Sequence, residues 1–300
     1  MITQRLQTLL KVAETKNYSK AAEELNLTQP AVSLHIKQLE QELETKIFRR
    51  TNHNVELTNE GAIVVKYATR LSNIYSNLKQ SLLDNQFNIK RLTIGLTPSV
   101  ESSIISRILA KYSLKKDNLH ITIISDTIKN LYIKLKNFEI DVAMVDGKIL
   151  DDHLKYILLD TDSLVLAVAN NNPLSKKKII SIQDLKKEKL ILRSEESGTT
   201  ELFETQLHHI GESIQNFEVM MEIDNIAMIK DLVRNNYGVS ILAKSTCLRD
   251  LEKNHFKSVS IENLSMVREL NIVYHRDFSH LDILSEIVSL YQNEKKQYEN

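Results

Sequence analysis

Hydrogen-bonding side chains stand at the start of an amphipathic helical pattern near the N-terminus. Gln29 and Ser33 are spaced one helical turn apart, with the apolar residues Pro30 and Leu34 beside them. Glutamine can pair bidentately with adenine, serine can donate or accept, and apolar side chains can contact the thymine methyl group. These residue types at this spacing indicate a helix that contacts base edges in the major groove of double-stranded DNA.

Basic side chains near this pattern suit the DNA backbone rather than the bases. Lys37 follows one turn later, and Arg49 and Arg50 precede a predicted hairpin over residues 51–57 with His53 at its tip. Lys and Arg contacts to phosphate position a protein on DNA without specifying sequence. The alternative is ordinary solvated surface. We favour DNA contacts because these residues lie beside the helix and the hairpin.

Short helices are expected to position these residues. Residues 3–15 form the first predicted helix, Ser19 is a suitable N-cap for the second, and Thr28 caps the third. Pro30 lies in the first turn of the third helix, where its missing N–H costs nothing. This arrangement is typical of a helix-turn-helix. The apolar residues that the third helix is expected to bury are Val32, Ile36, Leu39 and Leu43.

A long helix is predicted from Thr58 to about Gln86. Its apolar residues are spaced by three or four and form a seam that no neighbouring segment of the chain covers. An exposed seam of this length implies a partner. The alternative is packing against the chain's own C-terminal domain. The residues that we expect at a contact between two copies are Tyr67, Leu71, Ile74, Leu78 and Leu82.

From residue 91, strands alternate with helices of about ten residues, which indicates parallel α/β layers. Ligands of such folds bind beyond the carboxyl ends of strands, where helix N-termini and small hydroxyls favour a small anion. Each residue alone is more commonly a helix cap, and nearby carboxylates of Asp126, Glu195, Glu196 and Asp224 oppose an anion. The residues that we expect to bind this ligand are Thr97, Ser99, Thr127, Ser197, Gly198, Thr199 and Asn225.

The composition bears on how the protein can attract DNA and on the cellular compartment in which we expect it. The 300 residues include 39 basic and 39 acidic side chains, so any attraction to DNA must be local. Residues 1–58 hold eight Lys and Arg against seven Glu, a net charge of +1, so useful affinity needs two or more copies. The lone Cys247 suits a reducing cytosol and is most simply a buried apolar residue. With no membrane-length apolar run and no signal-peptide pattern, we expect a cytoplasmic protein.

The sequence contains no clear pattern of a metal site or a catalytic site. His208 and His209 are adjacent on a predicted helix and therefore point apart. No spaced set of His, Asp and Glu indicates a metal, and neither a nucleophile elbow nor a phosphate loop is found. We expect no cofactor and no enzymatic activity.

The segments AAEEL, TQPAVSLHIKQLE, IFRRT and LTNEG follow one another in the order and spacing of one known family. The chain resembles the LysR-type transcriptional regulators over nearly its whole length. The resemblance implies an N-terminal all-α winged helix-turn-helix over 1–58, a linker and dimerisation helix over 59–88, and a two-lobed α/β effector domain similar to a periplasmic binding protein over 89–300. It also implies a small-molecule effector in the cleft and a dimer or tetramer.

Within the effector domain we place lobe I at 91–161 and 267–300 and lobe II at 162–266, with a hinge at the two crossovers. Three positions depart from the family pattern. Glu44 stands where Gly is common after the recognition helix, Leu34 where many relatives carry Arg, and Thr200 where an Arg often follows Ser-Gly-Thr. Glu44 either adopts a left-handed conformation or ends the helix differently.

Three hypotheses about function follow. The favoured one is a ligand-responsive regulator that binds an interrupted palindrome in promoter DNA. The second is a solute-binding or enzymatic α/β domain with an incidental helical N-terminus, which would not need Gln29 and Ser33 exposed. The third is a DNA-binding protein that senses nothing, which a cleft filled by its own bulky side chains would favour.

Overall fold

The computed structural model describes residues 2–50 and 55–299. The chain divides into two compact units. One comprises Met1–Ile89 with Lys136–Glu139, and the other comprises Lys90–Leu135 with Ile140–Asn300. Each unit is described by itself.

The first unit contains the helix-turn-helix that the sequence predicts. Its elements are α1 (Ile2–Thr15), α2 (Tyr18–Glu24), α3 (Gln29–Glu42), β1 (Phe48–Arg50), β2 (Val55–Leu57) and α4 (Asn59–Gln86). Thr28 and Thr58 cap α3 and α4, as predicted. Ser19 is not the N-cap of α2. Asn17 is, because its side chain accepts hydrogen bonds from the backbone N–H groups of Ser19 and Lys20.

The core of this unit holds α3 against α1 and α2. Val32, Ile36 and Leu39 are buried as predicted, together with residues of α1 and α2. The prediction for Leu43 is wrong, because this side chain is 46% exposed. Helix α3 ends at Glu42 and Glu44 has a φ of 49°, so the chain leaves the helix at Leu43 and this side chain does not continue the buried stripe. The left-handed alternative for Glu44 is therefore confirmed.

Lobe I of the second unit is built on three parallel strands. Strand β3 pairs in parallel with both β4 and β5. Its elements are β3 (Lys90–Leu96), α5 (Pro98–Glu101), α6 (Ile105–Leu114), β4 (Leu119–Ser125), α7 (Ile128–Lys136), β5 (Val142–Asp146) and α12 (Leu281–Glu299). Helices α5 and α6 are two separate helices. The Ser103 hydroxyl donates to the carbonyl of Val100 and accepts from the N–H of Ile105, so it separates α5 from α6.

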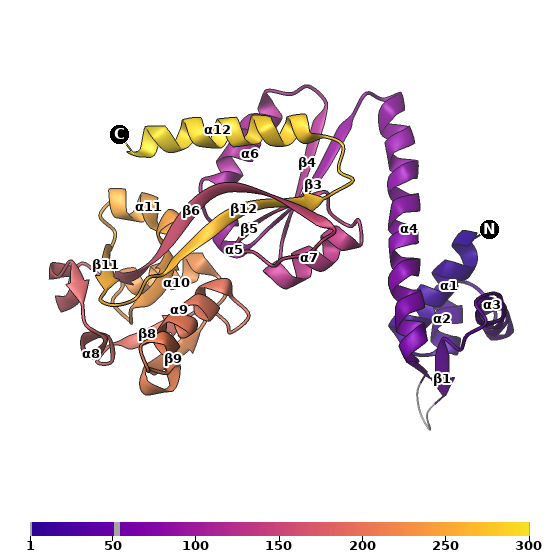
Figure 1. Cartoon of the computed structure of the whole chain (residues 1–300), viewed down its shortest axis with the longest axis horizontal. Helices are drawn as coiled ribbons and strands as arrows, with labels where there is room; N and C mark the ends of the chain where they lie inside the picture. The colour runs from indigo at the N-terminus through magenta and orange to yellow at the C-terminus, as the bar shows by residue number, and fades with distance from the viewer. Residues whose placement is uncertain (1, 51–54, 300) are drawn as a thin grey trace. The chain divides into compact units, whose positions relative to one another are not determined.

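Two long strands connect the lobes and run side by side (Figure 1). They are β6 (Leu154–Val168) and β12 (Val267–His275), and each is antiparallel to the other. The parallel layers that the sequence indicates do not extend to this region, because both crossovers are strands of one eight-stranded sheet and pair with each other in antiparallel orientation. The register of the pair shifts between Leu270 and Asn271. Our division into lobes at 161/162 and 266/267 stays a proposal that this geometry supports.

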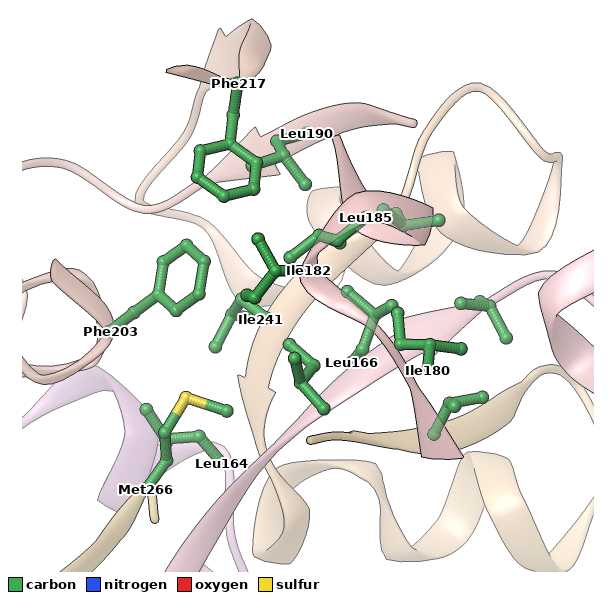
Figure 2. Close-up of a cluster of buried hydrophobic side chains, with 14 of the residues drawn as sticks. Leu164, Leu166, Ile180, Ile182, Leu185, Leu190, Phe203, Phe217, Ile241 and Met266 are labelled. Carbon is green, nitrogen blue, oxygen red and sulfur yellow. The ribbon is translucent and has the colours of Figure 1, made fainter. Parts of the chain in front are cut away.

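Lobe II surrounds the second half of β6, which pairs with β10 and β11. Its elements are η1 (Pro173–Lys176), β7 (Ile179–Ile180), α8 (Ile182–Leu185), β8 (Lys189–Leu192), α9 (Gly198–His209), η2 (Ile214–Asn216), β9 (Glu218–Glu222), α10 (Ile226–Arg234), β10 (Ser240–Ala243), α11 (Lys244–Glu252) and β11 (Lys257–Ile261). Figure 2 shows the core, where Leu166 and Ile241 lie near Phe203. The ring centroids of Phe203 on α9 and Phe217, the residue before β9, lie 6.3 Å apart in an edge-to-face arrangement, which joins α9 to the segment that leads into β9.

Candidate functional site

The outer face of α3 carries the side chains that the sequence predicts at DNA bases. Gln29, Pro30 and Leu34 are exposed, and Ser33 is half-buried. The amide nitrogen of Gln29 lies 3.3 Å from the hydroxyl oxygen of Ser33, so both polar groups occupy the same face. This face opposes the buried stripe of α3 and presents hydrogen-bonding groups beside apolar ones.

The predicted phosphate contacts differ in their surroundings. Lys37 is exposed on α3. Arg49 is also exposed, and its guanidinium lies 3.0 Å from the Glu56 carboxylate across the β1–β2 pair. The side chain of Arg50 and all of His53 lie outside the described residues.

The apolar seam on α4 is exposed in the described chain. Its five predicted members are each between 45% and 60% exposed. Helix α4 is 28 residues long, so the seam runs along most of its length. The exposure of Tyr67, Leu71, Ile74, Leu78 and Leu82 is therefore as the sequence predicts, and their contact with a second copy stays a prediction.

A cavity of about 190 Å³ lies between the lobes where strands end and helices begin, and we call it the cleft. Four of the predicted ligand-binding residues line it, namely Thr97, Thr127, Ser197 and Gly198. Ser99, Thr199 and Asn225 are not among its lining residues. Ser99 and Thr199 are buried and hydrogen-bonded to arginines, while the Asn225 side chain caps α10 by accepting from the N–H of Met228.

Arg193 in the cleft is a functional candidate that the sequence did not single out. It follows β8 directly, and its side chain is only 6% exposed. One guanidinium nitrogen lies 3.5 Å from the Ser99 hydroxyl and another 3.6 Å from the Asp224 carboxylate, whereas its Nε has no hydrogen-bond partner among the described residues. Burial lowers the pKa of Arg193, and Asp146 and Asp224 oppose that shift. The sequence signal that could have identified Arg193 is its position as a charged residue at the end of the apolar strand segment KLILR.

A second buried arginine stands behind the cleft. Arg268 on β12 forms an ion pair with Asp146 and donates to the Thr199 hydroxyl at 3.2 Å. It also lies 4.0 Å from the Asp162 carboxylate on β6. The Thr97 hydroxyl donates to Asp146 as well. Arg268 therefore joins residues of both lobes beneath the cleft, and removing it would leave buried carboxylates without their counter-charge.

The charged residues that line the cleft are mostly acidic. Against Arg193 stand the carboxylates of Asp126, Asp146, Glu196 and Asp224. Burial raises the pKa of Asp126, but hydrogen bonds from Asn130, the Thr127 N–H and Lys134 outweigh it, so its pKa lies below the usual value. Asp126 is therefore ionised at neutral pH. A ligand in the cleft meets one buried cation surrounded by negative charge.

Two other features bear on the expected chemistry. Cys247 is fully buried, and burial raises its pKa to about 11, which fits the buried apolar role predicted for it. Within residues 2–50 and 55–299, no cluster of three or more His, Cys, Asp or Glu could hold a metal ion. No helix in those residues is long and apolar enough to cross a membrane.

Comparisons with known proteins agree with this geometry. A family model described as LysR substrate binding domain matches residues 86–292, and one described as bacterial regulatory helix-turn-helix protein, lysR family, matches residues 3–62. The HTH-type transcriptional regulator CysL of Bacillus subtilis (strain 168) is 27% identical over 270 residues, covering 90% of this chain and 89% of that protein. The uncharacterised HTH-type transcriptional regulator MJ0300 of Methanocaldococcus jannaschii is 30% identical over 273 residues, covering 90% and 91%.

A solved structure shows the same fold. Full-length CbnR complexed with its target DNA has a TM-score of 0.68 and 16% identity, covering 97% of this chain and 98% of that chain. The two family models together span both units described above, from the helix-turn-helix to the two-lobed domain. The chain therefore belongs to the LysR family of helix-turn-helix transcriptional regulators.

Proposed function

We propose that this LysR-type regulator binds an interrupted palindrome in promoter DNA as a homodimer or a tetramer and responds to a small metabolite. The exposed polar face of α3, opposite a buried apolar stripe, is the observation that carries the proposal. The solved complex of full-length CbnR with its target DNA supports it. Because the lone Cys247 suits a reducing compartment, we infer that the protein acts in the cytoplasm.

Base contacts and phosphate contacts are distinguishable on α3. We expect Gln29→Ala to relax base preference at one position of the half-site by about 1–3 kcal/mol of discrimination. Lys37→Gln should instead weaken binding to all sequences alike and lower the salt slope by about 1. Competition binding to a set of single-base variants at two salt concentrations measures both effects. Uniform weakening by Gln29→Ala would show that Gln29 does not contact a base.

We propose that the α4 seam pairs with the same seam in a second copy. A single DNA-binding domain of net charge +1 gains useful affinity when two copies bind adjacent half-sites. Leu78→Glu places a charge in the seam and should shift the protein toward monomer in sedimentation experiments. Ser76→Glu adds the same charge at an exposed position away from the seam and is the matched control. Unchanged association of Leu78→Glu would exclude this seam as the interface.

For the cleft we propose a small metabolite with an anionic group, a carboxylate or phosphate, that pairs with Arg193. The buried Nε of Arg193, for which the described residues offer no hydrogen-bond partner, and the N-terminus of α9 favour the anion. The carboxylates of Glu196 and Asp224 favour a positive group elsewhere on the same molecule. A zwitterion such as an amino acid derivative meets both requirements. Thermal shifts with an α-amino acid, its amide and the matching plain carboxylic acid test this, and equal shifts with all three would contradict it.

Transmission of the signal is proposed to follow the two crossover strands. Ligand that contacts both lobes favours one arrangement of β6 and β12, and the oligomer converts it into a change in the spacing of the DNA-binding domains. A cleft filled by the protein's own side chains would favour the alternative hypothesis of a DNA-binding protein that senses no ligand. The cavity of about 190 Å³ is a specific observation against that second candidate.

The first experiment is retention of genomic DNA. Purified protein is mixed with sheared DNA from its source organism at near-physiological salt, and retained fragments are sequenced. Enrichment of fragments that share an interrupted palindrome would support sequence-specific binding by a dimer. Weak retention without a shared sequence would contradict unaided DNA recognition by the free protein.

A further inference from the structure

A second cavity between the lobes, of about 430 Å³, has a chemistry opposite to that of the cleft. We call it the basic cavity. On lobe II it is lined by side chains of α10 and α11 and the residues just after α11, and on lobe I by the segment from Glu101 to Arg107. Its lysines and arginines are Arg107, Lys230, Arg234, Arg249 and Lys253.

The lysines and arginines of the basic cavity include two pairs of like charge whose members lie one helical turn apart. Lys230 and Arg234 are four residues apart on α10, and Arg249 and Lys253 are four residues apart along α11 and its C-cap. Like charges at this spacing are neighbours on a helix surface and destabilise it. Two such pairs that line one cavity imply that a negative group compensates them.

Within the protein, one buried carboxylate carries most of that compensation. Asp250 is 8% exposed, lies 3.1 Å from the Lys230 ammonium, and also pairs with Arg234. The Nδ1 of His255 approaches it at 3.2 Å. One carboxylate therefore serves two full positive charges and an imidazole.

The remaining cations of lobe II lack such a partner. In the described part of the chain, neither Arg249 nor Lys253 makes an ion pair, and both are exposed at the cavity. Glu101, the other acidic residue of the lining, lies on the opposite wall beside Arg107 and the hydroxyls of Ser102 and Ser106. Among its Lys, Arg, Asp and Glu residues, the lining carries five positive and two negative charges.

We propose that the basic cavity binds a phosphate group, as free phosphate or as a small phosphomonoester. Guanidinium forks, ammonium groups and hydroxyls are the donors that phosphate oxygens prefer. Lobe II supplies Arg249 and Lys253, and lobe I supplies Arg107 and the Ser102 hydroxyl, so a bound phosphate contacts both lobes. This is a ligand site separate from the cleft, since the two cavities share no lining residue, and a phosphate held by both lobes biases the lobe arrangement.

Calorimetric titration of the full chain in low-salt chloride buffer tests the proposal. The probes are inorganic phosphate, glycerol 3-phosphate and, as an uncharged comparison, glycerol. The test variant is Arg249→Gln/Lys253→Gln, which spares the Asp250 ion pairs. The matched control is Lys176→Gln/Lys178→Gln, which removes the same charge from exposed positions of lobe II outside this lining. Thermal melts check that both variants fold.

We expect the test variant to lose roughly tenfold or more in affinity for the phosphate probes, and the control to match the wild type. Equal affinity for both probes identifies the phosphate group itself as the ligand, and much tighter binding of glycerol 3-phosphate identifies a phosphomonoester. Absence of phosphate binding overturns the proposal, as does equal weakening in test and control variants. Phosphorus NMR line widths of the probes give a second readout with the same variants.

Discussion

The cleft and the basic cavity both lie between the same two lobes, yet they carry opposite charge. Asp126, Asp146 and Asp224 in the cleft all stand at or just after the ends of strands. The cations of the basic cavity come from helices: two lie on α10, two on α11 and its C-cap, and Arg107 lies on α6. Short acidic side chains are common where chains turn after strands, whereas long basic ones extend from helices across a cavity. One two-lobed scaffold can therefore offer two ligand sites with different selectivity.

The strongest test of this comparison concerns the arginine behind the cleft. Arg268→Met leaves Asp146 and Asp162 buried without their shared cation, and we expect the free energy of unfolding to fall by about 3 kcal/mol. Urea denaturation followed by circular dichroism measures it. Arg276→Met, at an exposed position after β12, is the control and should change stability by less than about 0.5 kcal/mol. Equal losses in both variants would show that Arg268 is not a special support of the cleft.

A smaller effect is expected on the basic side. Asp250→Asn leaves Lys230 and Arg234 without their carboxylate, but Arg234 is partly exposed and can be solvated. We expect a loss of about 2 kcal/mol in the same denaturation experiment. Asp231→Asn on the exposed side of α10 is the matched control. A gain in stability for Asp250→Asn would mean that the cations do not need this carboxylate.

The pH dependence of that loss gives a further test. Burial raises the pKa of Asp250, but hydrogen bonds from Arg234, His255 and Lys230 outweigh it, so its pKa lies below the ordinary 3.8. Its stabilisation is therefore present above pH 3.8 and is lost as the pH falls through the folded-state pKa. The gap in stability between wild type and Asp250→Asn should shrink from pH 6 toward pH 3. A constant gap would contradict an ionised, paired Asp250.

The smallest effect is expected at the rim of the cleft. Glu196 is exposed, and the described residues provide it with no ion pair. Glu196→Gln should change the free energy of unfolding by less than about 0.5 kcal/mol. Thermal melts suffice to measure it. A loss well above that bound would assign Glu196 to structural support, and the acidic rim would then have a role in stability rather than ligand selection.

The DNA-binding unit was largely predictable because its signals are local. Caps at Thr28 and Thr58, the Pro in the first turn of α3 and the apolar spacing are all set by near neighbours. The predictions for Ser19 and Leu43 miss the ends of their helices by two residues and one residue. There, competing caps and a left-handed Glu44 decide the boundary.

The cleft was predictable in place but not in chemistry. Strand ends and helix starts located Thr97, Thr127, Ser197 and Gly198 correctly on its wall. Arg193 follows β8 and Arg268 lies on β12, 75 residues apart in the sequence, yet both lie near Asp146. Their approach is a long-range feature of the folded domain, and local patterns do not encode which buried charges the fold brings together.

One glycine sets a limit on how this regulator can be re-engineered. A Cβ atom at Gly61 would lie 2.0 Å from the carbonyl oxygen of Ile47, so the first turn of α4 rests directly on the backbone that leads into β1. The Thr58 N–H also donates to that carbonyl. In a chimera that takes residues up to 58 from one relative and the rest from another, the two sides of this contact would come from different proteins. We expect such a chimera not to transfer DNA specificity intact. Exchange of promoter recognition between relatives therefore needs at least the first turn of α4 to be transferred together with the recognition helix.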